Sequence, residues 1–242
     1  MLVDVLKKNL PEYKITLPVT KKKISFRPLL VKEEKFISAI NELSSSVSNK
    51  LINLSNLVDS CCNDSIKSVN LPIYDFQYLL AEIRKNSVLE ISKLKMTCPH
   101  TKERVDATVN LNEYKKKKNT NSELSINVSD NMTIEFRIPT LKDLTQIDNF
   151  IKSKTELIQL MALCLIGTET PEEKIDLASY SYEQKIEFLE YLSTKDFYKV
   201  KDFIMDSFIT FKIEYLTSDN KLRNVEVNDF VNFLKFYLIM LI

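Results

Sequence analysis

The feature that most constrains the fold of this chain is its single glycine, Gly167, among 242 residues. Glycine-rich loops that cradle nucleotide phosphates, of the dinucleotide and P-loop kinds, are therefore excluded. Turns must instead be built from Asn, Asp, Ser and Pro. Gly167 follows an apolar stripe of helical spacing, so we predict that it ends a helix.

Apolar periodicity divides the chain into short strands and amphipathic helices. Alternation over Lys23–Phe26 predicts a strand that Pro28 ends, and Tyr13–Leu17 alternates likewise, so the two form a hairpin. After Pro28, a helix is expected with Leu29, Phe36, Ile40 and Leu43 on one face and Leu30 and Ile37 beside it. Further helices are expected at residues 47–58, from about 73 to 83 with Asp75 as N-cap, and at 157–165, 182–192 and 194–208.

Three further hairpins are expected at 90–97 with 104–111, 124–128 with 132–138, and 211–215 with 222–227. The first and last resemble each other, with "K-L-K-M" and "T-V-N-L" in one and "K-I-E-Y" and "V-E-V-N" in the other. Two related lobes or two ordinary hairpins explain this echo equally well. We predict an α+β fold of helices packed on small antiparallel sheets, in two lobes joined near Pro139. Residues 1–139 form the first lobe, and residues 140–242 form a mostly helical second lobe with one hairpin.

The charge balance argues against a nucleic-acid binder. The chain has 34 basic and 33 acidic side chains and a net charge of +1, whereas nucleic-acid binders carry a basic excess. No apolar run reaches the roughly 20 residues that a membrane span needs. An acidic residue, Asp4, interrupts the N-terminus, so we expect no signal peptide and synthesis in the cytoplasm.

Residues suited to metal binding or catalysis are few. Cys98 and His100 resemble half of a zinc site, but Cys-x-His is not a standard ligand pair, and Cys61 and Cys62 would have to fold back to complete it. We expect instead a polar turn with a partly exposed thiol. His100 is the only histidine, and no nucleophile–base pair stands out. We therefore expect no metal site, no cofactor and no enzymatic activity.

Two segments suggest protein binding. Lys115–Lys118 is a basic run that fits either a solvated loop or an acidic partner. The C-terminal run 230–242 is interrupted only by Asn232 and Lys235, so a helix there would be apolar nearly all round. Such a helix is buried either in its own domain or in a partner's groove.

Several segments of the amino-acid sequence resemble those of a known protein family. Phe26–Lys35 ("F-R-P-L-L-V-K-E-E-K") resembles the opening signature of a baseplate hub family of T-even-like contractile-tailed phages. The other matching segments are 71–80 with 83–87, the hairpin with Cys98-Pro99 at its turn and Val109–Leu111 in its return strand, 136–141, and 192–197 with Phe203. The resemblance covers nearly the whole chain.

The resemblance implies a role in forming the hub of a phage tail baseplate through protein–protein binding. The chain would be an assembly factor for hub or tape-measure proteins, or a resident hub subunit, with self-association a further option. It would be found in the host cytoplasm during assembly or in the virion tail. A metal-dependent nucleic-acid module is a more distant alternative. The candidate partner-binding residues are Phe26, Arg27, Glu33, Asp75, Arg84, Phe230, Phe233, Phe236 and Tyr237. The charged residues among them equally suit intramolecular pairs that fix the first lobe, which is the default expectation for Arg27 and Arg84.

Overall fold

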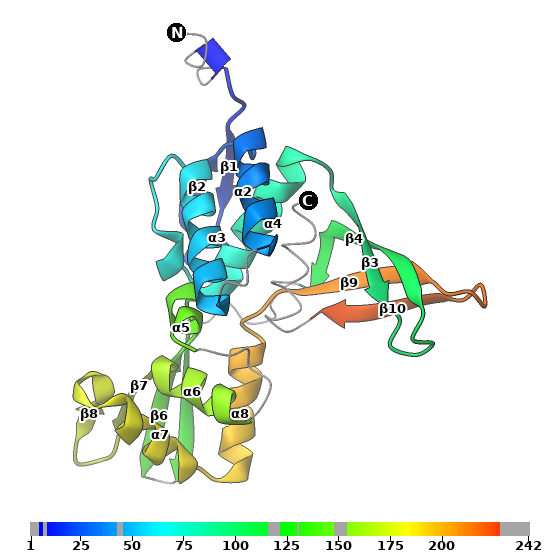
Figure 1. Cartoon of the computed structure of the whole chain (residues 1–242). Helices are drawn as coiled ribbons and strands as arrows, with labels where there is room; N and C mark the ends of the chain where they lie inside the picture. The colour runs from blue at the N-terminus through cyan, green and yellow to red at the C-terminus, as the bar shows by residue number, and fades with distance from the viewer. Residues whose placement is uncertain are drawn as a thin grey trace.

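The computed structural model describes residues 5–6, 9–42, 46–115, 122–129, 131–147 and 154–227. Within these residues the protein has seven α-helices and three antiparallel sheets, so the predicted α+β class is confirmed. A helical body with a small hairpin, a sheet with helices beside it, and a second, projecting sheet can be distinguished in Figure 1. None of the helices in the described part of the chain is long and apolar enough to cross a membrane.

The helical body is formed by the first part of the chain. It contains β1 (Tyr13–Thr16), β2 (Lys23–Phe26), α2 (Val31–Glu42), α3 (Val47–Cys61), a 3₁₀ turn η1 (Ser68–Asn70) and α4 (Ile73–Ser87). The predicted hairpin is confirmed, because β1 pairs with β2 and Tyr13 lies opposite Phe26. In α2 the predicted inner face is wrong at Phe36, whose side chain is 45% exposed, whereas its neighbour Ile37 is buried. Ile40 and Leu43 lie outside the residues whose side chains are described.

The two four-stranded sheets recruit strands from both halves of the chain. One has the order β10-β9-β4-β3 and the other the order β5-β6-β7-β8. Their strands are β3 (Ile91–Thr97), β4 (Arg104–Lys115), β5 (Glu123–Ser129), β6 (Met132–Arg137), β7 (Leu165–Glu169), β8 (Lys174–Asp176), β9 (Thr210–Leu216) and β10 (Leu222–Val227). Because β4 pairs with β9 and β6 with β7, the sheets do not follow a division at residue 139.

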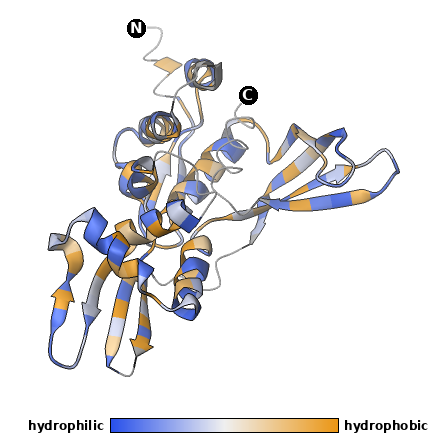
Figure 2. Ribbon diagram, turned by 60° about the horizontal axis from the view of Figure 1, so that its bottom comes forward, coloured by the Kyte–Doolittle hydropathy of each residue, from blue (hydrophilic) through white to orange (hydrophobic). Residues whose placement is uncertain are grey.

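Pro139, where the lobes are expected to join, is fastened to the helical body. Its carbonyl accepts the N–H of Ile73 at 2.9 Å, and the N–H of Leu141 donates to the carbonyl of Leu71 at 3.1 Å. The helices that follow are α5 (Leu141–Thr145), α6 (Lys154–Cys164), α7 (Tyr182–Glu190), preceded by the 3₁₀ turn η2 (Leu177–Ser179), and α8 (Thr194–Met205). One continuous apolar core joins all of these elements, and apolar and polar residues alternate along the strands that face it (Figure 2).

The order of elements occurs twice along the chain. The first half runs β1-β2, α2, α3, α4, β3-β4, and the second runs β5-β6, α5, α6, α8, β9-β10 with β7, β8, η2 and α7 inserted before α8. The two hairpins of the sequence echo meet in one sheet, where β4 lies beside β9. The architecture therefore extends the echo to the whole order of elements. We refer to residues 165–190, which have no counterpart in the first half, as the inserted segment.

Two local predictions are wrong for identifiable reasons. Gly167 does not cap a helix but lies in β7, where a Cβ would come within 2.8 Å of the carbonyl oxygen of Ile175. Glycine is needed there because two backbones approach closely beside a bulge. Asp75 is not the N-cap of α4, which begins at Ile73 after Pro72. Asparagine and aspartate do supply left-handed turn residues, at Asn63, Asp64 and Asn220, as do Lys21 and Lys102.

Candidate functional site

The guanidinium of Arg27, just after β2, binds two neighbouring elements. Its terminal nitrogens donate to both carboxylate oxygens of Glu33 at 2.9 and 2.7 Å. Nη2 also donates to the backbone carbonyl of Ser60, near the end of α3, at 3.2 Å. The main-chain N–H of Arg27 donates to the carbonyl of Cys61 at 2.9 Å. This ion pair, which we call the first latch, joins β2 to α2 and α3.

Glu33 also caps the helix that contains it. Its Oε2 accepts the N–H of Leu30, just before α2, at 2.8 Å. Burial acts to raise the pKa of Glu33, but hydrogen bonds from Arg27 and Leu30 outweigh burial, so this pKa lies below its ordinary value. The hydrogen bond to Glu33 in turn raises the pKa of Arg27. Both groups are thus charged at neutral pH. Arg27 forms the intramolecular ion pair that the sequence analysis expected for it, with Glu33 as its partner.

A second latch has the same spacing of six residues. Arg137, which ends β6, donates to both carboxylate oxygens of Asp143 at 2.6 and 2.9 Å. Its Nη2 also donates to the carbonyl of Leu163, in α6, at 2.8 Å. Asp143 accepts the N–H of Thr140 at 2.7 Å, as Glu33 accepts that of Leu30. In both halves of the chain, an arginine–carboxylate ion pair therefore connects a strand to the two helices that follow it.

Asp75 holds the turn of the first hairpin against α4. Its Oδ1 accepts the N–H of Val19 at 2.7 Å, and its Oδ2 accepts the N–H and the hydroxyl of Thr20 at 2.8 and 2.7 Å. The Asp75 side chain is completely buried. These three bonds fix the hairpin on the helix, and they explain why an acid occupies the first turn of α4.

A polar groove with a volume of about 590 Å³ lies beside the first latch. Its walls include Pro11, Glu12, Arg27, Lys32, Asn63 and Asp64. Cys61 and Cys62 are close by, but burial raises the pKa of each thiol to about 12. Protonated thiols are poor nucleophiles and poor metal ligands. The groove presents polar and charged groups of both signs to the solvent, which suits binding of a polar partner.

The expectation of a partly exposed thiol at Cys98 is wrong. The side chain is fully buried, its Sγ accepts the N–H of Thr101 at 3.4 Å, and it lies 3.6 Å from the hydroxyl of Tyr215. Burial acts to raise the pKa of Cys98, but hydrogen bonds with Thr101, with Tyr215 and with the backbone of His100 outweigh it and lower the pKa to about 7. His100 is exposed. Over the described residues, no group of three or more His, Cys, Asp or Glu side chains is placed to hold a metal ion.

The other predicted partner-binding residues differ in their surroundings. Phe26 is fully buried beside Tyr13, with ring centroids 5.6 Å apart, and Arg84 is buried on α4. Both side chains are thus part of the interior of this chain, although their role toward partners stays a prediction. The remaining four, at the C-terminus, lie outside the described residues: Phe230, Phe233, Phe236 and Tyr237.

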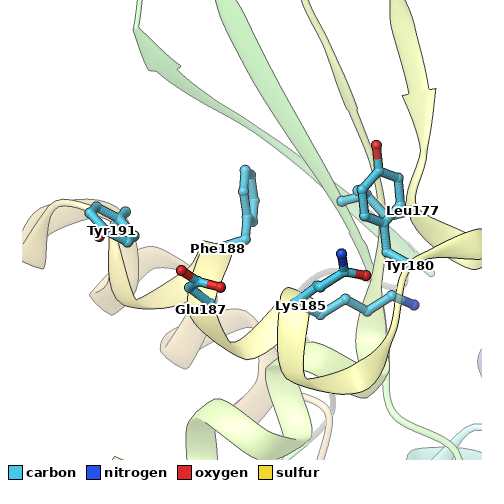
Figure 3. A pocket seen from close by; sticks show the side chains of 7 residues that line it. Leu177, Tyr180, Lys185, Glu187, Phe188 and Tyr191 are labelled. Carbon is cyan, nitrogen blue, oxygen red and sulfur yellow. The ribbon is translucent and has the colours of Figure 1, made fainter.

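The sequence analysis missed two features. The second latch has a readable signal, because Arg137 and Asp143 repeat the spacing of Arg27 and Glu33 after a buried phenylalanine. The other feature is an aromatic pocket of about 350 Å³ between η2 and α7. Figure 3 shows Phe188 projecting between Tyr191 at one end and Tyr180 with Leu177 at the other. Its residues come from two short elements, so no single periodic stripe indicates it.

The fold and these contacts define a protein of the α+β class in which one buried ion pair, one partly exposed ion pair and a buried aspartate hold helices on strands. A family model described as "T4 bacteriophage base plate protein" matches residues 10–235, most of the chain. The chain therefore belongs to this family of phage baseplate proteins, and it has a structural or assembly role related to the baseplate. No curated protein and no solved structure matches the chain.

Proposed function

We propose that this protein acts in assembly of the baseplate hub by binding other phage proteins, without catalysing a reaction. The observation that carries the proposal is the match to the baseplate protein family over residues 10–235. The resemblance of Phe26–Lys35 to the hub family supplies the narrower assignment to the hub. Hub or tape-measure proteins are the proposed partners.

The geometry supports binding in two ways. The latches and Asp75 place charged groups where they fasten the protein's own elements, so they stiffen the scaffold. A rigid scaffold loses little conformational freedom on binding, which favours affinity. The polar groove beside Arg27 and the aromatic pocket at α7 then offer two chemically different surfaces to partners.

Deletion of the coding sequence from the phage tests the proposal. We expect infected cells to accumulate tail components without complete baseplates, and expression of the chain from a plasmid to restore them. Normal baseplates in the deletion phage would contradict the proposal. Quantitative mass spectrometry of purified virions then separates two mechanisms, because an assembly factor is absent from the particle and a resident subunit is present in stoichiometric amount.

A further inference from the structure

The aromatic pocket at α7 is set in an exposed surface on which acidic side chains outnumber basic ones. Tyr191 and Tyr180 line the pocket with their side chains 86% and 43% exposed. Lys185 and Glu187 stand at its margin (Figure 3). Tyrosine is enriched at the energetic centres of protein interfaces, so two exposed tyrosines beside a pocket mark a candidate binding surface. A volume of about 350 Å³ fits one or two side chains of a binding partner.

The charge of the inserted segment differs from that of the remaining chain. Residues 165–190 carry seven acidic and two basic side chains, a net charge of −5 within a chain of net charge +1. All seven acidic residues are exposed: Glu169, Glu172, Glu173, Asp176, Glu183, Glu187 and Glu190. The near-neutral total thus hides a strongly acidic region, which attracts a basic partner and repels an acidic one.

The position of the segment indicates that it is an addition to the shared architecture. The first half passes from α3 to α4 through η1 alone, whereas the second half places β7, β8, η2 and α7 between α6 and α8. The first latch, the second latch and the Asp75 contacts all lie outside residues 165–190. The described ion pairs within or onto the segment involve Lys174 with Glu135 and Glu169, and none of them involves Glu187 or Glu190 of α7.

We propose that the aromatic pocket between η2 and α7 docks a basic segment of another phage protein. In that segment an apolar side chain enters the pocket, and flanking Lys or Arg side chains meet Glu183, Glu187 and Glu190. A cation can also stack on the exposed ring of Tyr191 or Tyr180. This proposal rests on the proposed function, which it sharpens by naming the chemistry of the partner.

A second copy of this chain is the less favoured occupant. Lys115–Lys118 supplies a basic run, but contact between that run and the α7 pocket would be heterologous. Heterologous contacts generate rings or open filaments instead of closed dimers. The test therefore separates a different protein from a second copy.

Photo-crosslinking of the full-length protein in infected cells tests the docking site. The photoreactive residue p-benzoylphenylalanine is placed at position 191, and position 198 on α8 is the control, since Tyr198 is an exposed tyrosine, at 47%, that does not line the pocket. We expect position 191, but not 198, to crosslink to a peptide of another phage protein that contains an apolar residue flanked by Lys or Arg. Crosslinking only to a second copy, only to a segment without basic residues, or to no protein overturns the proposal.

Charge reversal tests the electrostatic part. The double variant Glu187→Lys, Glu190→Lys should lower the crosslinking yield by at least about tenfold, because it places like charges opposite each other across the contact. The control Asp106→Lys, on the exposed face of β4, should leave the yield unchanged. An unchanged unfolding midpoint in urea shows that the double variant folds. An equal yield from the double variant and the wild type overturns the proposal.

Phage yield separates this proposal from the proposed function. If the deletion phage is rescued as well by Tyr191→Ser and by the double charge-reversal variant as by the wild-type chain, the docking site is wrong and the assembly role stands. If the deletion phage produces normal baseplates, the assembly role itself fails.

Discussion

The two latches connect a strand to the helices that follow it, and they do so with different side chains. In each, an arginine at the end of a strand binds a carboxylate six residues later, and that carboxylate also accepts a backbone N–H at the start of a helix. The first uses glutamate and the second uses aspartate. They differ in burial, because the Arg27 side chain is 12% exposed and that of Arg137 is 36% exposed.

This difference has an energetic consequence. Charges near a surface interact through solvent of high dielectric constant, whereas buried charges rely on each other. The first latch should therefore contribute more to stability than the second, although their hydrogen-bond distances are nearly equal. The comparison shows that equivalent contacts in the two halves of one chain can contribute unequally to the free energy of unfolding.

The largest expected effect is that of removing the first arginine. Arg27→Ala leaves Glu33 with a nearly buried and unpaired charge, and breaking such a pair costs about 3–5 kcal/mol of unfolding free energy. Arg137→Ala should cost only about 1–2 kcal/mol, because Arg137 itself is partly exposed and the buried Asp143 keeps the N–H and the hydroxyl of Thr140 as hydrogen-bond donors. Urea unfolding followed by circular dichroism measures both.

The exposed pair of Lys174 and Glu135 provides the control, since Lys174→Ala should change the unfolding free energy by at most about 0.5 kcal/mol. An equal or larger loss in Arg137→Ala than in Arg27→Ala would remove the distinction between the latches.

The next effect concerns the helix that follows each latch. Asp75→Asn keeps the shape of the side chain but places an amide group opposite donors from Val19 and Thr20. We expect a loss of about 2–3 kcal/mol, the value of hydrogen bonds to a buried charged group. Hydrogen exchange should accelerate at the Val19 and Thr20 amides. Asp196 lies at the corresponding place in the first turn of α8 and pairs with Lys199, so Asp196→Asn should have a smaller effect.

A third effect is specific to the inserted segment. In Gly167→Ala the new Cβ would lie within 2.8 Å of the carbonyl oxygen of Ile175, so β7 and β8 must separate. Overpacking of this kind costs about 1–3 kcal/mol. Limited proteolysis should then cleave residues 165–190 sooner while the first half stays resistant. Unchanged proteolysis would mean that β8 shifts without cost.

The smallest effect is a pH dependence of the first latch. The folded-state pKa of Glu33 lies below its unfolded value, so its stabilisation is fully present above the unfolded pKa of about 4.3. That stabilisation is lost as the pH falls through the folded-state pKa. As the pH falls below about 4.3, the unfolding free energy should therefore fall more steeply in the wild type than in Glu33→Gln. Parallel curves would show that Glu33 does not titrate below its unfolded value.

Local patterns predicted most elements, because helices and hairpins depend on nearby residues. The stripe Phe76, Leu79, Leu80 and Ile83 and the inner face of α8 are buried as expected. The pairing of strands was harder to predict, since β4 pairs with β9, which lies far away in the sequence. The strands β7 and β8 are too short to give a clear alternation of apolar and polar residues. The sequence around Asp75 is typical of a helix N-cap, but its hydrogen-bond partners, Val19 and Thr20, are distant in the chain. Long-range contacts of this kind leave no periodic signal.

The candidate surfaces were predictable only in part. Arg27 and Glu33 were identified through the signature that contains them, whereas the aromatic pocket requires η2 and α7 to meet in space. The acidic character of residues 165–190 was present in the sequence, but the near-zero net charge of the whole chain concealed it. Charge counted by segment would have revealed it.

Complementation in vitro tests the central claim most directly. Extracts of cells infected with a phage lacking this chain are mixed with the purified protein, and complete baseplates are counted by electron microscopy. The account predicts few baseplates before addition and restoration in proportion to the protein added. Baseplates that form equally well without the protein would contradict it.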